Sequence, residues 1–162
     1  MQASIAGNTP GYVVDNHPNN ETSYHARFYF NPNGTTTNSS QHDLFVGRNA
    51  ANTPILRVQY RRNSVGQYQM RAAALVSVGQ SFTSWFTTTN SAHAVELAWQ
   101  SSTSGSLSLY IDGSLQQTLG GNTSAYQLKS VLLGPSGGLA AGMSGTEYFD
   151  AFVSTRTDYI GP

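Results

Sequence analysis

The stretch from His93 to Gly113 constrains the fold more than any other part of this chain. Apolar side chains take every second position in two short runs, Val95, Leu97 and Trp99, then Leu107, Leu109 and Ile111. Successive side chains of a strand point to opposite faces, so the pattern predicts two half-buried antiparallel strands. Asp112-Gly113 at the end is a hairpin signal. The apolar face needs a partner sheet, and the opposite face is expected to be free for function.

Elsewhere in the chain, segments with the same alternation are separated by Gly and Pro residues. No segment keeps a helical period over three turns. About ten strands are expected, a number typical of a β-sandwich or barrel. They lie near residues 11–15, 24–30, 43–47, 55–61, 68–74, 74–78, 83–87, 93–99, 106–111, 130–133 and 146–154. Two packed antiparallel sheets are the natural solution. With no internal repeat and no linker, residues 1–162 are expected to form one domain.

Composition excludes several classes of protein. Charged residues make up only 10% of the chain, against roughly 25% in an ordinary globular domain. The net charge of +0 argues against nucleic acid as a partner. No cysteine is present, and no stretch approaches the ~20 apolar residues of a membrane span. The first ten residues lack the basic start and apolar core of a signal peptide. We expect a secreted or cell-surface protein, in which case this chain is a mature form or an excised module.

Three segments resemble laminin-G-like, concanavalin-A-like jelly-roll domains of bacterial type. They are HAVELAWQSSTSGSLSLYIDG (residues 93–113), GTEYFDAFVSTRTDYIGP (145–162) and SYHARFYFNPNG (23–34). The resemblance runs from near Gly11 to Pro162. It implies an all-β, two-sheet antiparallel jelly-roll sandwich of the concanavalin A-like lectin/glucanase fold. The superfamily includes lectins, carbohydrate-binding modules, adhesion modules and glycosidases, so the resemblance does not decide function.

The acidic residues give no sign of a glycosidase site. Such enzymes place two carboxylates on either side of the bond that they cleave. Here Glu147 and Asp150 are three positions apart, which puts them on opposite faces of a strand, and Glu96 stands alone. The histidines (His17, His25, His42 and His93) have no G-x-S-x-G nucleophile motif and no zinc-ligand spacing, so we expect them on the surface or in loops. The sequence therefore predicts that the protein is not an enzyme.

Calcium is a candidate cofactor by resemblance. Many jelly-roll modules carry one structural Ca²⁺ at the rim of the sandwich, held by a carboxylate and backbone carbonyls. The resemblance puts Asp150 at such a position, with Asp15 or Asn16 as a partner. The alternative is that Asp150 accepts hydrogen bonds from neighbouring backbone N–H groups.

The outward-facing side chains are the best candidates for ligand contact. If the strands align as expected, the set is Arg27, Tyr29, Arg57, Gln59, Arg61, Gln69, Arg71, Glu96, Ser108 and Tyr110. Guanidinium forks and tyrosine rings suit sugar hydroxyls, uronate carboxylates and sulfates. The alternative is ordinary cross-strand pairing on a solvated face. From this set we select Arg57, Arg61, Arg71, Glu96 and Tyr110, and add Trp85 as a sugar-stacking ring, although Trp85 can equally pack at the end of the sandwich.

These observations predict a non-catalytic, extracellular carbohydrate-binding (lectin-like) module whose partner is a carbohydrate or glycoconjugate. The alternative is a structural or adhesive subunit of a surface or filamentous assembly, because a nearly uncharged surface has few charges to desolvate when copies associate. A glycoside hydrolase of the same fold is the third hypothesis.

Overall fold

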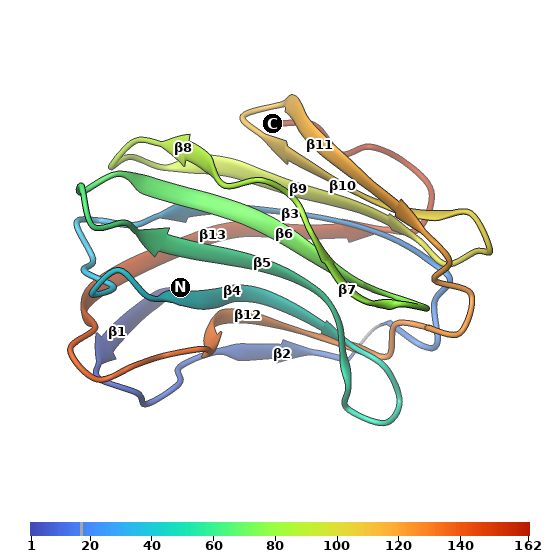
Figure 1. The fold of residues 1–162 in the computed structure, drawn as a ribbon, viewed down its shortest axis with the longest axis horizontal. Helices are drawn as coiled ribbons and strands as arrows, with labels where there is room; N and C mark the ends of the chain where they lie inside the picture. The colour runs from blue at the N-terminus through green and yellow to red at the C-terminus, as the bar shows by residue number, and fades with distance from the viewer. Residues whose placement is uncertain (17) are drawn as a thin grey trace.

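A computed structural model describes residues 1–16 and 18–162, and it consists of two antiparallel sheets packed as a sandwich (Figure 1). The first sheet has six strands in the order β1-β13-β3-β9-β10-β11. The second has seven, in the order β2-β12-β4-β5-β6-β7, with β8 also paired to β6. The expected all-β jelly-roll sandwich is confirmed. The strands are β1 (Gln2–Ala6), β2 (Val13–Asp15), β3 (Ser23–Asn31), β4 (Gln41–Arg48), β5 (Pro54–Arg62), β6 (Tyr68–Val76), β7 (Gly79–Phe82), β8 (Phe86–Thr88), β9 (His93–Gln100), β10 (Gly105–Ile111), β11 (Ser114–Gly121), β12 (Ser130–Gly137) and β13 (Ser144–Thr155).

The core lies between the sheets and is built from alternate side chains of facing strands. Phe28 of β3 and Phe45 of β4 stack across the gap with ring centroids 5.9 Å apart. Phe30 meets Tyr60 of β5 edge-on at 5.2 Å. Such aromatic contacts add to the stabilisation from burial. Trp99 is 2% exposed and also belongs to this core.

The two strands predicted from His93 to Gly113 are present as β9 and β10. Each apolar side chain of that pattern is buried. Asp112 and Gly113 have φ angles of 50° and 76°, the left-handed pair that a tight hairpin turn requires. This turn leads into β11, a strand that the sequence pattern does not predict.

The unpredicted strands carry weak periodicity. The leucines of β11, Leu115 and Leu119, are four positions apart, and the register of β11 against β10 shifts at Leu109/Tyr110. In β1 the buried side chains are Ala3 and Ile5, too few to mark a strand. Strand β7 reads Gly-Gln-Ser-Phe and is mostly exposed. The two weaker strands expected over residues 74–87 correspond to the end of β6, to β7 and to β8.

The outer face of β9 and β10 is not free, which corrects the expectation from the sequence. The C-terminal segment, residues 156–162, folds back over it. Both carboxylate oxygens of Glu96 accept backbone hydrogen bonds, from Ile160 at 2.8 Å and from Gly161 at 3.0 Å. The ring of Tyr159 lies 4.9 Å from that of Tyr110. Glu96 is consequently only 3% exposed.

The expectation of surface histidines is wrong at two positions. His42 is 0% exposed and lies between the sheets, against Glu147. His93 is 8% exposed. His17 lies outside the described residues. Within residues 1–16 and 18–162, no helix has the length and apolar character needed to cross a membrane.

Candidate functional site

Polar side chains of β4, β5 and β6 gather on the outer face of the second sheet. On β5 the alternation turns Arg57, Gln59 and Arg61 outward while Val58 and Tyr60 enter the core. The antiparallel register places Gln59 opposite Arg71, and Arg61 opposite Gln69. Asp43 of β4 lies opposite Gln59 on the other side. We call the surface formed by Asp43, Arg57, Gln59, Arg61, Gln69, Arg71 and Trp85 the arginine face.

Hydrogen bonds between neighbouring strands hold these side chains in place. Arg71 Nε donates to Gln59 Oε1 at 2.9 Å, and Arg61 Nε donates to Gln69 Oε1 at 2.8 Å. Gln59 Nε2 in turn donates to Asp43 Oδ1 at 2.9 Å. Arg57 Nη1 donates to the other oxygen of Asp43. The two glutamines therefore fix two guanidinium groups through Nε alone.

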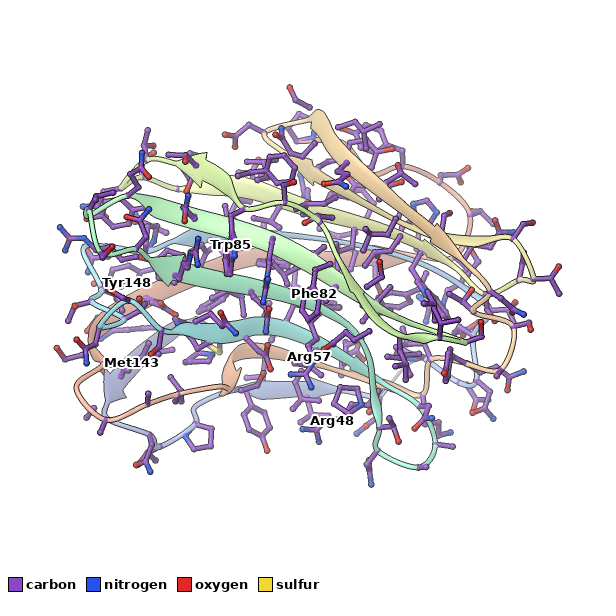
Figure 2. All side chains as sticks on the ribbon, viewed as in Figure 1. Arg48, Arg57, Phe82, Trp85, Met143 and Tyr148 are labelled. Carbon is purple, nitrogen blue, oxygen red and sulfur yellow. The ribbon has the colours of Figure 1, made fainter. Side chains whose placement is uncertain are left out.

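Aromatic rings cover the same guanidinium groups. The guanidinium carbons of Arg61 and Arg71 lie 4.1 Å and 4.4 Å from the centroid of the Trp85 ring. Arg71 also lies 4.2 Å from the Phe82 ring. These are cation–π distances. In Figure 2 the labelled Trp85, Phe82 and Arg57 appear over β6, β5 and β4. The segment between β7 and β8 thus places the indole of Trp85 over the outer face of the sheet to which both strands pair.

The electrostatics of the arginine face favour anions. It holds three guanidinium groups and one carboxylate, whereas the whole chain has a net charge of +0. Burial and the neighbouring Arg61 lower the pKa of Arg71 from its ordinary value, and Asp43 opposes this. An arginine keeps its charge in spite of such shifts. Two like charges held close together gain from a bound anion, which relieves their repulsion.

Hydrogen-bond donors remain for a ligand. Among residues 1–16 and 18–162, no hydrogen bond from the terminal Nη atoms of Arg61 or Arg71 is found. Arg57 Nε also has no partner there, but it is buried and so is not one of these donors. Beside Arg57, a cavity of ≈ 330 Å³ opens between the face and a neighbouring loop; it is lined by Ser40, Gln41, Asp43, Arg57, Gln59, Gly138 and Ala140.

Four of the six residues selected from the sequence meet here: Arg57, Arg61, Arg71 and Trp85. The other two do not share this face. Glu96 of β9 and Tyr110 of β10 belong to the first sheet, where the C-terminal segment contacts both of them. An outward position alone does not tell which of two sheets a strand joins, so the sequence does not separate these two faces.

The two carboxylates proposed for calcium lie on different sheets, Asp150 on β13 and Asp15 on β2. Asp150 Oδ1 accepts a hydrogen bond from the backbone N–H of Ala151 at 2.8 Å, as the alternative from the sequence foresees. In the described part of the chain, no group of three or more His, Cys, Asp or Glu side chains is placed to hold a metal ion. Calcium stays a prediction from resemblance.

The sequence did not single out Asp43, Gln59, Gln69 or Phe82 as site residues. The two glutamines do follow the same period of two as the arginines, so their outward orientation was predictable. Their role depends on the register between β5 and β6, which the sequence does not show. Asp43 is 1% exposed although it faces outward, because Arg57 and Gln59 cover it.

No family model matches this chain, and no curated protein matches it either. Solved structures do. The alginate lyase Aly36B, in a mutant complexed with alginate trisaccharide, superposes with a TM-score of 0.70 at 13% identity, covering 97% of this chain and 81% of that one. An alginate lyase from Pseudomonas aeruginosa gives 0.61 at 14%, covering 86% and 69%.

A third structure is the ligand-binding domain of botulinum neurotoxin serotype D, complexed with N-acetylneuraminic acid. It gives a TM-score of 0.64 at 10% identity and covers 98% of this chain but 39% of that one. Identities this low show a shared fold and nothing more. The jelly-roll-like sandwich is thereby confirmed, whereas the laminin-G type stays a prediction.

The comparison contradicts the prediction that this protein is not an enzyme. Two of these three structures are lyases with the same fold. The requirement for a pair of carboxylates belongs to glycoside hydrolysis, and a lyase is a different class of enzyme. The isolated Glu96 therefore does not exclude catalysis in this chain.

Proposed function

We propose that the arginine face binds an acidic carbohydrate. The observation that carries the proposal is the pair Arg61 and Arg71, each held through Nε by a glutamine and stacked against Trp85. A guanidinium group fixed in this way presents its remaining N–H groups as a fork that matches a carboxylate. Little side-chain entropy is then left to lose on binding.

Two further observations support an acidic sugar as the ligand. Trp85 is only half-buried, so part of the indole surface is accessible to a sugar ring. The structures of similar fold were solved with alginate trisaccharide and with N-acetylneuraminic acid, both of which are sugars that carry carboxylates. As the sequence suggested, we place such a protein outside the cell or at its surface, where such polymers occur.

The proposal is tested by calorimetric titration with oligosaccharides that differ in charge. A uronate oligosaccharide is expected to bind, and a neutral one of equal length to bind far more weakly. Arg61→Gln and Arg71→Gln are each expected to raise Kd roughly ten- to a hundredfold, because hydrogen bonds to charged groups contribute roughly 1.5–3 kcal/mol. Circular dichroism checks that each variant folds.

Lys129→Gln is the matched control, since it removes one exposed cation away from the arginine face. Equal losses in the control and in Arg71→Gln would contradict a localised site. Repeating the titration with calcium and with a chelator tests the predicted cofactor. Shortening of the oligosaccharide during the titration would show that the protein also cleaves it.

Self-association remains the second candidate, as the nearly uncharged surface suggests. Sedimentation over a range of concentrations distinguishes it from the first. Assembly that grows with concentration, together with no binding of any oligosaccharide, would favour the structural or adhesive subunit.

A further inference from the structure

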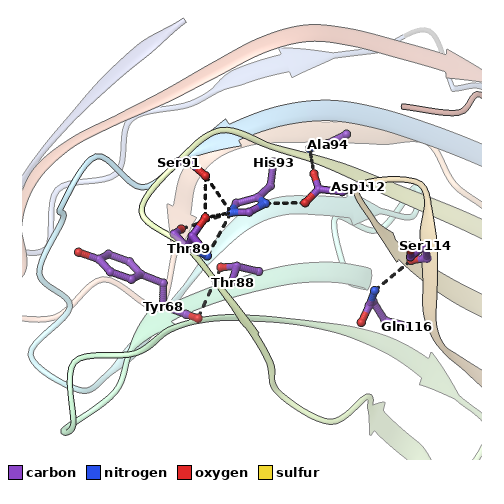
Figure 3. A network of polar contacts seen from close by, with 9 residues as sticks. All are labelled: Tyr68, Thr88, Thr89, Ser91, His93, Ala94, Asp112, Ser114 and Gln116. Carbon is purple, nitrogen blue, oxygen red and sulfur yellow. Dashed lines mark hydrogen bonds and ion pairs between the residues drawn. The ribbon is translucent and has the colours of Figure 1, made fainter.

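A second polar cluster lies away from the arginine face, where the loop between β8 and β9 meets the turn between β10 and β11. It consists of Thr89, Ser91, His93 and Asp112 (Figure 3). A pocket of ≈ 430 Å³ opens beside it. The pocket is lined by Thr87, Thr88, Thr89, His93, Ile111, Asp112, Ser114 and Gln116. No step of the proposed carbohydrate binding uses these residues.

The contacts of His93 favour one tautomer. His93 Nδ1 lies 2.7 Å from Asp112 Oδ2, and an ionised carboxylate can only accept, so Nδ1 carries a proton. The backbone N–H of Thr89 points at Nε2 from 3.2 Å. A backbone N–H can only donate, so Nε2 presents its lone pair. Nε2 also lies 3.3 Å from the carbonyl oxygen of Thr89. In the tautomer that accepts the Thr89 N–H, the imidazole directs its basic nitrogen at the loop.

Asp112 is itself held in place. Its other oxygen, Oδ1, accepts a hydrogen bond from the backbone N–H of Ala94 at 2.9 Å. The Asp112 carboxylate thus links the turn between β10 and β11, in which Asp112 lies, to the start of β9. A base oriented by a carboxylate is the arrangement that activates hydroxyl nucleophiles in unrelated folds.

Two hydroxyl groups stand at the basic nitrogen. Thr89 Oγ1 lies 3.0 Å from His93 Nε2, within reach of direct proton transfer. Ser91 Oγ lies 2.6 Å from Thr89 Oγ1 and 3.5 Å from Nε2. Both residues are exposed, and Thr89 lines the pocket. Asp112, His93 and Thr89 thereby form a line of carboxylate, base and hydroxyl that ends in a space able to admit a small molecule.

We propose that this cluster is a nucleophilic site for small acyl esters, with the hydroxyl of Thr89 as the nucleophile. Thr89 Oγ1 attacks the acyl carbon while its proton passes to His93 Nε2. The bond from the acyl carbon to the alcohol oxygen breaks, and the alcohol leaves with that proton. Water then attacks the acyl-threonine, which releases the carboxylic acid and restores the hydroxyl. Ser114 and Gln116 line the same pocket and can supply donors to the developing oxyanion. One N–H of the Gln116 amide donates to the Ser114 carbonyl oxygen at 3.1 Å, which leaves the other N–H for this role.

The test uses p-nitrophenyl acetate as the ester. The protein is expected to release p-nitrophenolate in a burst, and mass spectrometry of the quenched protein is expected to find one acetyl group on Thr89. Thr89→Val keeps the shape of an exposed side chain and removes the hydroxyl, and it should abolish the burst. His93→Gln should slow acetylation about a hundredfold, the scale of general-base catalysis.

Two comparisons separate this chemistry from simple loss of structure. Asp112→Asn is expected to lower kcat more than it changes KM, because Asp112 acts by positioning the base through Nδ1. His25→Gln, which removes a histidine on β3, is expected to leave the burst unchanged. Thermal unfolding monitors the fold of every variant. Acetylation on any other residue, or a rate in folded Thr89→Val equal to that of the wild type, would overturn the proposal.

Discussion

A histidine and a glutamate buried between the two sheets form a polar pair that the sequence pattern does not reveal. His42 Nε2 of β4 lies 3.1 Å from the Glu147 carboxylate of β13, and both side chains are 0% exposed. The pair faces Tyr60, whose pKa is raised by burial and by the charge of Glu147. Polar residues occupy both sides of β4 at His42 and Asp43, so the period-two pattern gives no sign of which one enters the core.

Removing one member of this pair is expected to be costly. Glu147→Ala leaves a polar ring in the core with no partner, and breaking a buried pair costs about 3–5 kcal/mol. Urea denaturation of Glu147→Ala should show a loss of unfolding free energy of that size. The double variant His42→Leu/Glu147→Met replaces both polar groups by apolar ones and should recover most of it. If the single variant were as stable as the wild type, the pair would have no structural role.

At the scale of elements, the alternation of apolar and polar residues predicts the strands whose side chains build the core. It does not predict the strands that only cover the core. Strands β3, β5, β6, β9 and β10 follow from apolar side chains at every second position. Strand β11 and the C-terminal segment do not. Strand β11 pairs with β10 across a tight turn but lacks alternating apolar side chains, and the C-terminal segment owes its position to Glu96, far back along the chain. The same limit applies to the arginine face, where the outward orientation of the arginines and glutamines was predictable and the pairing between them was not, because it depends on the register of β5 against β6.

One side chain holds two backbone groups of the C-terminal segment. Glu96 accepts the backbone N–H groups of Ile160 and Gly161, and charge-assisted hydrogen bonds of this kind contribute roughly 1.5–3 kcal/mol. Glu96→Ala is therefore expected to detach residues 156–162 and to leave the sheets intact. Hydrogen exchange should show at least roughly tenfold faster exchange of those two amides. Ser108→Ala, on the same face, is the control. Unchanged exchange in Glu96→Ala would assign the docking to Tyr159, whose ring contacts Tyr110, and to Arg27, whose Nη1 donates to the carbonyl oxygen of Gly161 at 3.2 Å.

Across the whole molecule, the sandwich keeps two polar surfaces apart by placing them on opposite outer faces. The arginine face belongs to the second sheet, and the face around Glu96 belongs to the first. The sequence does not separate them because a period of two distinguishes inside from outside but not one sheet from the other. Strand order supplies that distinction, and it arises from pairings such as β3 with β13 and β4 with β12, which join distant parts of the chain.

The clustering of positive charge on the arginine face of a neutral chain also predicts how salt affects carbohydrate binding. The chain as a whole has a net charge of +0, so long-range attraction between protein and polyanion is weak. Any salt dependence must come from the local cluster of Arg57, Arg61 and Arg71. Charges in water are screened over about 10 Å at 0.1 M salt. The affinity for a uronate oligosaccharide is therefore expected to fall by roughly an order of magnitude between about 0.05 and 0.5 M salt. Titrations at both salt concentrations measure this effect, and Arg61→Gln should show a shallower dependence than the wild type. An affinity that does not change with salt would mean that the ligand binds by stacking on Trp85 rather than through the guanidinium groups.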